Sequence, residues 1–341
     1  MKSSKTILLT GASGVVGSAL VPELLNQGFK VITLVHNTLV THPHVINVKG
    51  NVSEPWFGLD LAQLESTSGP IECVIHSAAL THFGKSEEDM HKANVVGTMN
   101  AVAVANSLNA RLIYVSTAYT HDLKLPEYLK EYSTYCQSKR NAEAHVKAYA
   151  NDWTIMRPSI VVGDSQTGAI SQFQGLHSIV GAILQGYAPV IPAKSDALVD
   201  LIPQDVLARA ICAIAGRNGM HREYWITQGS AAEKVANIHV MLERFSRSFG
   251  YTRAMPKIVD PEVIDRLFIP VFMPSLPKGA RKRLKALVDH ACYFNMTEPF
   301  PSNYGELADE FNLPPLPESE AVILNNMSYW AEQTRYRERA A

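Results

Sequence analysis

A tyrosine and a lysine stand four residues apart in the segment YCQSKRNAE, which begins at Tyr135 and includes Lys139. In a helix this spacing places both side chains on one face. A nearby ammonium favours the phenolate and so lowers a phenol pKa that is ordinarily about 10. Such a phenol can protonate a carbonyl oxygen as a general acid. Because the chain contains 13 tyrosines, a solvated helix pair is the alternative when these residues are considered alone.

Two hydroxyl residues, Ser116 and Thr117, follow the apolar run ARLIYV, ahead of Tyr135 in the chain. The run is typical of a buried strand, and open α/β sheets bind ligands at the carboxyl ends of their strands. A hydroxyl from Thr117 would hold a carbonyl oxygen and stabilise the charge that develops on it. These residues give the hypothesis of a carbonyl that receives hydride from a cofactor and a proton from Tyr135.

Three glycines near the N-terminus, Gly11, Gly14 and Gly17, are spaced G-x-x-G-x-x-G between a strand-like run and a helical pattern. Glycine permits positive φ and lets the backbone approach a pyrophosphate closely. The helix that follows presents free N–H groups and the positive end of its dipole to phosphate. The pattern therefore predicts a dinucleotide site that includes Ser13 and Val15 of the same turn, and simple turn chemistry is the alternative.

The second strand-like run ends in LVHN, where a site for NAD commonly has an acidic residue that bonds the ribose 2′-hydroxyl. No Asp or Glu occurs between Glu23 and Glu54. His36 and Asn37 are instead hydrogen-bond donors that suit a 2′-phosphate. The sequence therefore favours NADP over NAD and leaves NAD open.

Strand-like runs alternate with helical patterns from the N-terminus, and they are KTILLT, FKVITLV, HVINVK, IECVIHSAA, ARLIYVST and DWTIMRP. This alternation predicts an α/β fold with a parallel sheet covered on both faces. After about residue 165 the pattern becomes rich in proline and helix, which predicts a smaller, mainly helical C-terminal substrate lobe. We assign residues 1–164 to the dinucleotide-binding domain and 165–341 mainly to the lobe, with 198–228 returning to the sheet.

The composition is that of a globular protein, with 46% hydrophobic residues, 18% charged residues and a formal net charge of −1. It gives no sign of nucleic-acid binding or of a polybasic membrane anchor. The uncharged stretch 165–193 contains glutamines, glycines and prolines, so we expect a buried helix rather than a transmembrane segment. Four widely spaced cysteines and the lack of a signal-peptide pattern predict a reduced, cytoplasmic protein. His42 and His44 have no third ligand nearby, so no metal site is expected.

Several motifs occur in order along the chain, namely the glycine turn, HSAA at 76–79, NVVGT at 94–98, VSTAY at 115–119, the Y-x-x-x-K pair and RPSIVVGDSQTG at 157–168. Over residues 1–210 this set resembles the extended short-chain dehydrogenase/reductase family. The segments GNVSEPWFGLD and RPSIVVGDSQTG resemble in particular its fatty acyl-CoA reductase and thioester reductase branch, which is called the male-sterility type. The resemblance implies a Rossmann-type, doubly wound sheet.

The resemblance also implies a Thr/Ser–Tyr–Lys active site, in which Tyr135 is the general acid/base and Lys139 binds the nicotinamide ribose. Thr117 rather than Ser116 would face the substrate. Asn94 matches the family's helix asparagine, which supports a proton relay, and a simple bond to backbone is the alternative. Further cofactor contacts are implied for His36, Asn37, Asn51, Val52, Ala78, Ala79, Pro158, Ser159 and Ile160.

The implied reaction is hydride transfer from NADP(H) to a carbonyl, and the branch favours an acyl thioester on CoA or a carrier, which gives an aldehyde or alcohol. The branch usually has Asp where this chain has Asn51 and commonly Arg where it has His36, which keeps NAD open. A sugar-nucleotide epimerase or dehydratase and a 3β-hydroxysteroid-like alcohol dehydrogenase are alternatives, and a non-catalytic dinucleotide sensor ranks last. Homodimers are frequent in the family, so the resemblance leaves a homodimer open.

Two apolar stretches, 165–193 and RLFIPVFMPSLP at 266–277, would supply a slot for an acyl chain, with buried core as the alternative. The basic segment PKGARKRLKALV at 277–288 would meet the phosphates of CoA, although a solvated helix face is the more common reason for such a run.

Overall fold

The structure is a computed structural model, and it describes residues 5–81, 86–121, 130–186, 188, 190–217, 222–248, 255–264, 266, 270, 271, 274, 279, 281 and 296–334. The expectations for RLFIPVFMPSLP and PKGARKRLKALV therefore lie almost entirely outside the described residues.

A seven-stranded parallel sheet forms the N-terminal body in the order β11-β6-β5-β4-β1-β2-β3. Its strands are β1 (Thr6–Thr10), β2 (Lys30–Val35), β3 (Val45–Lys49), β4 (Cys73–His76), β5 (Arg111–Val115), β6 (Trp153–Pro158) and β11 (Arg222–Ile226). β1, β4, β5 and β6 are buried along their whole length, because helices cover both faces of the sheet. The strand order reverses between β1 and β4, which confirms the α/β, Rossmann-type doubly wound fold.

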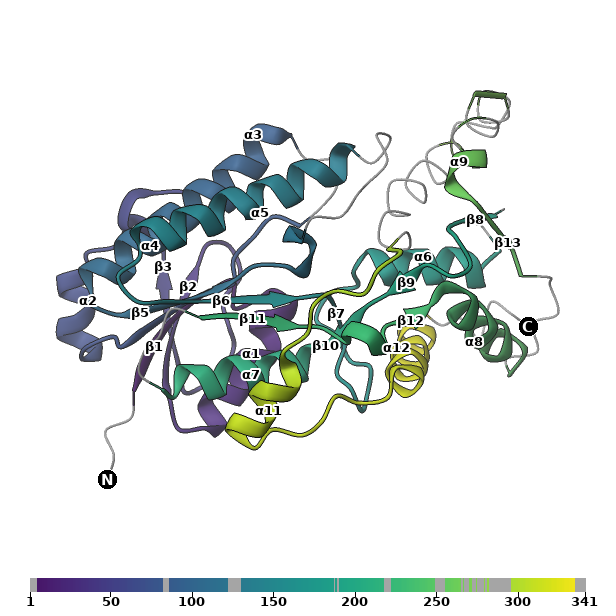
Figure 1. The fold of residues 1–341 in the computed structure, drawn as a ribbon. Coiled ribbons are helices and arrows are strands. Elements are labelled where there is room, and N and C mark those ends of the chain that lie inside the picture. Colours follow the sequence, from purple (N-terminus) through teal and green to yellow (C-terminus); the bar gives the residue numbers. More distant parts are fainter. Residues whose placement is uncertain are drawn as a thin grey trace.

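Helices cover the sheet in two layers (Figure 1). One layer contains α1 (Val15–Asn26), α7 (Gln204–Ala215) and α11 (Tyr304–Phe311). The other layer contains α2 (Leu61–Ser68), α3 (Glu87–Met90), the π-helical segment η2 (His91–Val96), α4 (Gly97–Ser107) and α5 (Lys130–Tyr149). Short 3₁₀ turns are η1 (Pro55–Gly58), η3 (Ala118–Thr120) and η5 (Gly229–Ala231). Pro22 lies inside α1 without ending that helix.

The C-terminal lobe lies beyond the carboxyl ends of the central strands (Figure 1). Its helices are α6 (Gly175–Leu184), α8 (Val235–Ser248), α9 (Pro261–Val263) and α12 (Ser319–Gln333). Its strands form three two-stranded sheets, which pair β7 (Ile160–Val162) with β10 (Leu201–Pro203), β9 (Leu198–Val199) with β12 (Glu233–Lys234), and β8 (Val190–Pro192) with β13 (Lys257–Val259). The core of the lobe is a separate apolar cluster contributed mainly by α6, α8 and α12.

The segment 198–228, which we expected to return to the sheet, does so only in part. β11 joins the edge of the main sheet beside β6, whereas residues 198–203 form β9 and β10 in the small sheets. The reason is that the chain continues past Pro158 into β7, and β10 pairs with this extension. In the uncharged stretch 165–193 the structure contains a ten-residue helix, α6. Across the described helices, none has both the length and the apolar character that crossing a bilayer requires.

Candidate active site

The glycine turn connects β1 to α1 at the carboxyl edge of the sheet. Gly11 has φ +73°, and a Cβ there would lie 2.6 Å from the backbone nitrogen of Ala78. A Cβ at Gly17 would overlap the Gly11 carbonyl oxygen. Gly14 is the N-cap of α1, where no side chain caps the helix and the first turn has no acidic residue. The first-turn N–H groups lack helical partners, so this turn fits a pyrophosphate.

Two cavities lie on either side of this turn, and together they contain most of the expected site residues. The central cavity, of about 340 Å³, is lined by Gly14, Val15, Val16, Ser77, Ala79, Leu80, Thr81, Val115, Ser116, Thr117, Tyr119, Tyr135, Lys139, Pro158, Ser159, Ile160, Val161, Gln172 and Gln174. The β2 cavity, of about 290 Å³, is lined by Gly11, Ala12, Ser13, Leu34, Val35, His36, Asn37, Thr38, Val40, Gly50, Asn51, Val52 and Ala78. A dinucleotide across the turn would reach both cavities.

The β2 cavity has no acidic residue among the described residues that line it. His36 and Asn37 are exposed at the end of β2. The Asn51 carboxamide oxygen accepts a bond from the Ser53 N–H at 3.0 Å, so this side chain shapes its own turn. A carboxylate that could accept a bond from a ribose 2′-hydroxyl is therefore not found among the described residues of this cavity.

Tyr135 and Lys139 both line the central cavity from α5, and only 9% and 2% of their surfaces are exposed. Burial raises the pKa of Tyr135, as does the neighbouring Cys136 thiol, while a hydrogen bond with the Thr117 side chain opposes this. Burial lowers the pKa of Lys139 to about 7, and the Glu143 carboxylate opposes this change. The expected lowering of the phenol pKa by the lysine is therefore absent here.

Burial is the main influence on the pKa of this phenol, and the lysine side chain bonds other groups. The Lys139 Nζ donates to the Val115 carbonyl oxygen at 3.0 Å and to the Tyr114 hydroxyl at 3.2 Å, so it is directed at β5. The phenol of Tyr135 stays protonated near neutral pH in this state. This is the form that a general acid needs.

Ser116 and Thr117 have different partners although they are neighbours. The Ser116 hydroxyl donates to Glu143 Oε1 at 2.5 Å. The same carboxylate receives two bonds from Arg157, at 2.9 Å from Nε and 2.5 Å from Nη2. Thr117 accepts a bond from the Tyr119 N–H at 3.3 Å and interacts with the phenol of Tyr135. Thr117 is thus the hydroxyl that remains beside Tyr135, while Ser116 is held by Glu143.

Asn94 lies behind the central cavity and does not line it. Its carboxamide oxygen accepts from the Leu80 N–H at 2.7 Å, and its nitrogen donates to the Leu80 carbonyl oxygen and to the Ser138 hydroxyl, both at 3.0 Å. Leu80 lines the cavity, and Ser138 bonds the carbonyl oxygen of Tyr135 at 2.7 Å. Asn94 therefore connects the loop after β4 to the helix that carries Tyr135.

Besides cavity-lining residues such as Ser77, Tyr119 and Gln174, the expected set lacked three residues that lie behind the cavity, namely Tyr114, Glu143 and Arg157. Glu143 lies four residues after Lys139, so the i, i+4, i+8 series from Tyr135 would have identified it. Arg157 is the first residue of the motif RPSIVVGDSQTG, and its guanidinium carbon lies 4.6 Å from the centroid of the Trp225 ring. The sequence did not single out Tyr114, because it lies in a strand-like run whose residues are expected to fill the core, and all of β5 is indeed buried.

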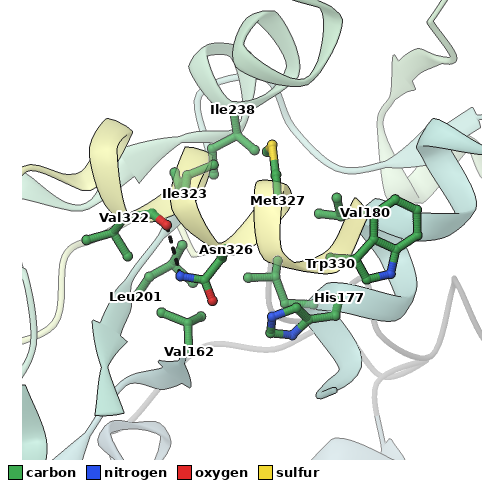
Figure 2. A pocket seen from close by; sticks show the side chains of 11 residues that line it. Val162, His177, Val180, Leu201, Ile238, Val322, Ile323, Asn326, Met327 and Trp330 are labelled. Carbon is green, nitrogen blue, oxygen red and sulfur yellow. Dashed lines mark hydrogen bonds between the residues drawn. The ribbon is translucent and has the colours of Figure 1, made fainter. Parts of the chain in front are cut away.

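A separate apolar cavity lies inside the lobe between α6, α8 and α12 (Figure 2). This lobe cavity, of about 30 Å³, is lined by Val162, Leu176, His177, Val180, Leu201, Ile238, Val322, Ile323, Asn326, Met327 and Trp330. Burial lowers the pKa of His177 to about 4, so this imidazole is neutral. His177 Nδ1 accepts from the N–H of Gln174, which lines the central cavity. The first turn of α6 therefore borders both cavities.

Comparison with known proteins identifies a family model and several curated relatives. The family model described as male sterility protein matches residues 35–211. The NRPS-like oxidoreductase fscA of Fusarium equiseti is 25% identical over 206 residues, which cover 52% of this chain and 20% of that protein. The L-2-aminoadipate reductase large subunit of Penicillium chrysogenum is 26% identical over 268 residues, which cover 63% of this chain and 19% of that protein. The chain thus spans about a fifth of the length of these curated relatives.

Two solved structures show the same fold. The terminal R domain from the myxalamid PKS-NRPS biosynthetic pathway has a TM-score of 0.75 and 23% identity, with 98% of this chain and 92% of that chain covered. UDP-glucuronic acid 4-epimerase from Bacillus cereus, in complex with NAD, has a TM-score of 0.65 and 16% identity, with 96% and 99% covered.

Proposed function

We propose a function from one premise: the chain belongs to the male sterility protein family, within the extended short-chain dehydrogenases/reductases, and is an NAD(P)-dependent enzyme of that type. The proposed reaction is the NADPH-dependent reduction of an acyl thioester, carried by CoA or by a carrier protein, to an aldehyde. The thiol is released, and one hydride and one proton are consumed. A second reduction of the aldehyde would give the alcohol.

The observation that carries this proposal is the meeting of Thr117, Tyr135 and Lys139 in one cavity beside the N-terminus of α1. A reduced nicotinamide bound in the central cavity would supply the hydride. The hydroxyl of Thr117 would orient the carbonyl oxygen, and the protonated phenol of Tyr135 would donate its proton to that oxygen. The resulting hemithioacetal breaks its carbon–sulfur bond to give aldehyde and thiol.

Lys139 has a separate role in the proposal. Its ammonium would bond the hydroxyls of the nicotinamide ribose and hold this part of the cofactor beside Tyr135. Because burial brings its pKa to about 7, the ammonium is the minor form in alkaline solution. Ser116, Glu143 and Asn94 would act indirectly, since their hydrogen bonds are to protein groups around the cavity.

The lobe cavity supports an acyl group as the substrate (Figure 2). Nine of its eleven lining residues are apolar, and the first turn of α6 places it next to the central cavity. An adjoining cavity of the same volume shares Leu176, Val180 and Ile238 with it. The lobe cavity is small, at about 30 Å³, so in this proposal it takes only a short acyl end.

The relatives favour a thioester over other carbonyl substrates. One is named an aminoadipate reductase and another a terminal R domain of a PKS-NRPS pathway. A third solved relative is a thiolation-reductase di-domain from an archaeal non-ribosomal peptide synthetase, with a TM-score of 0.72 and 17% identity. A thiolation domain carries acyl groups as thioesters, so a carrier protein is the partner that we propose for this chain.

The test follows oxidation of NADPH and of NADH with short and long acyl-CoAs, carrier-bound thioesters, ketones and nucleotide sugars. We expect NADPH consumption that depends on a thioester, with one free thiol released for each aldehyde formed. Interconversion of a nucleotide sugar without net consumption of the cofactor would replace this proposal with the epimerase alternative. Thioester reduction that is unchanged in Tyr135→Phe would contradict the role of the phenol.

A further inference from the structure

Tyr114 is a fully buried residue of β5 that makes direct contact with Lys139. The Lys139 Nζ donates to its hydroxyl at 3.2 Å and lies 4.7 Å from the centroid of its ring. The ammonium therefore has both a hydrogen-bond acceptor and an aromatic face on the same side chain. A cation close to an aromatic ring gains more when both are removed from water, as they are here.

The ring of Tyr114 is itself held in place by stacked neighbours. His76 of β4 stacks with it at 5.9 Å and 19°, and Phe57 stacks with His76 at 6.5 Å and 19°. The Nδ1 of His76 bonds the Thr10 hydroxyl oxygen at 2.8 Å, and this oxygen accepts from the Ala78 N–H at 3.2 Å. Because each ring is fully buried, Tyr114 has little freedom to move away from the lysine.

The charges around Lys139 explain why a neutral acceptor matters. Its titratable neighbours are Glu143 and Tyr135 on α5, His76 on β4 and Tyr114 on β5. Glu143 is the acidic group among them, and Arg157 already bonds both of its carboxylate oxygens. Burial lowers the pKa of His76 to about 3, aided by Lys139 itself, so this imidazole is neutral. The ammonium thus depends on the Val115 carbonyl and the Tyr114 hydroxyl for its direct bonds.

We propose that Tyr114 is a positioning residue, whose hydroxyl and ring hold the Lys139 ammonium at the wall of the central cavity. The contact is independent of the reaction, but its value in turnover rests on the proposed function, in which Lys139 binds the nicotinamide ribose. A purely structural tyrosine would fill the core without affecting the ionisation of the lysine. The two roles can therefore be separated by measuring the lysine directly.

The first test measures the titration of Lys139 in the whole 341-residue chain without cofactor, from the ¹³C shift of its Cε, with a Lys139→Arg variant to assign the signal. In Tyr114→Phe the ring remains and the acceptor is lost, so the midpoint should fall by about one pH unit. The matched control is Tyr304→Phe, which removes the hydroxyl of another buried tyrosine, bonded to the Pro314 carbonyl oxygen at 2.9 Å. The control should leave the midpoint unchanged.

An equal Lys139 midpoint in wild type and Tyr114→Phe would overturn the proposal. A second variant, Tyr114→Met, has a smaller side chain with neither the ring nor the hydroxyl, so it should lower the midpoint as well. A midpoint that is unchanged in Tyr114→Met is a second result that overturns it.

The second test measures NADPH affinity against pH by nicotinamide fluorescence, without an acyl substrate. Affinity that uses the ammonium should decline as pH rises through about 7 in wild type. In Tyr114→Phe the decline should begin about one unit lower, and a profile identical to wild type would contradict the positioning role. Absence of thioester reduction, with the shifted titration retained, would remove the proposed function and leave the Tyr114 contact standing.

Discussion

The central cavity and the lobe cavity differ in the contacts that form them, which are polar in the first and apolar in the second. In the central cavity, polar side chains have polar partners: Lys139 bonds Tyr114 and Val115 of β5, and Ser116 bonds Glu143 of α5. In the lobe cavity, helices from distant parts of the chain meet through apolar side chains, and His177 and Asn326 are the polar residues among the described ones that line it. Under the proposed function, the central cavity would carry out the reaction and the lobe cavity would select the acyl group. Substitutions in the two regions should therefore differ in kind.

The largest effect on the central cavity is expected from Tyr135→Phe. Loss of the proton donor should lower kcat by a factor of about 10²–10⁴, because this is the usual contribution of general acid catalysis. Stability and NADPH affinity should change little, since the ring remains. The measurement is steady-state turnover of NADPH with the best thioester substrate. If NADPH affinity falls as much as kcat, the phenol binds cofactor rather than supplying a proton.

The buried ion pair behind Ser116 comes next. Glu143→Gln leaves the buried Arg157 with Glu223, 2.5 Å away, as its one carboxylate partner in the described part of the chain, so the free energy of unfolding should fall by about 3 kcal/mol. The matched control on the lobe is Glu243→Gln, whose pair with Arg247 is exposed and should be worth less than about 1 kcal/mol. Urea unfolding measures the free energy of unfolding of both variants. Equal losses would show that the buried ion pair contributes no more to stability than the exposed one.

Acid should destabilise the lobe through His177. Its pKa is about 4 in the folded state against 6.5 as the ordinary value, so the unfolded chain takes up the proton first. The stability that the neutral imidazole contributes is present above pH 6.5 and is lost as pH falls from 6.5 towards 4. His177→Gln should show a smaller loss of unfolding free energy over this window than wild type. Parallel curves for the two proteins would exclude this residue as the cause.

Chain-length preference should respond to the lobe cavity and not to the sheet. Val180→Phe fills the cavity and should reduce kcat/KM for the longest accepted acyl group about tenfold, with the shortest little affected. Val240→Phe is the control, because Val240 lies on α8 with 43% of its surface exposed. A loss that is equal for all acyl lengths would mean that the cavity is core and not part of the substrate site.

The smallest effect is expected at the β2 cavity. His36→Arg would add a fixed positive charge at the end of β2 and should strengthen NADPH binding about fivefold, as expected for one exposed ion pair of about 1 kcal/mol. Affinity for NADH should hardly change, because it has no 2′-phosphate. Fluorescence titration with both cofactors gives the ratio, and His42→Arg, outside both cavities, serves as control. An equal gain in affinity for both cofactors would show that the 2′-phosphate does not bind beside residue 36.

The sequence was most informative where chemistry depends on spacing along a single element. The glycine turn, the strand-end hydroxyls and the Tyr135–Lys139 pair could all be recognised, because each occupies one turn or one helix face. The direction of the Lys139 side chain could not be predicted, because the groups that it bonds lie in another element, β5. The raised pKa of Tyr135 depends on burial by the surrounding fold. The lobe cavity could not be predicted either, because its lining residues range from Val162 to Trp330 and no local sequence pattern connects them.

The position of β11 at the edge of the main sheet has a consequence for dissecting the protein. This strand follows the first part of the lobe in the chain, yet it pairs with β6 and supplies Glu223 to Arg157. A fragment that ended at residue 164 would expose the backbone of β6 as an open edge and would lack α7, which packs on α1. Truncation there should give an insoluble product, so the two halves must be expressed as one polypeptide.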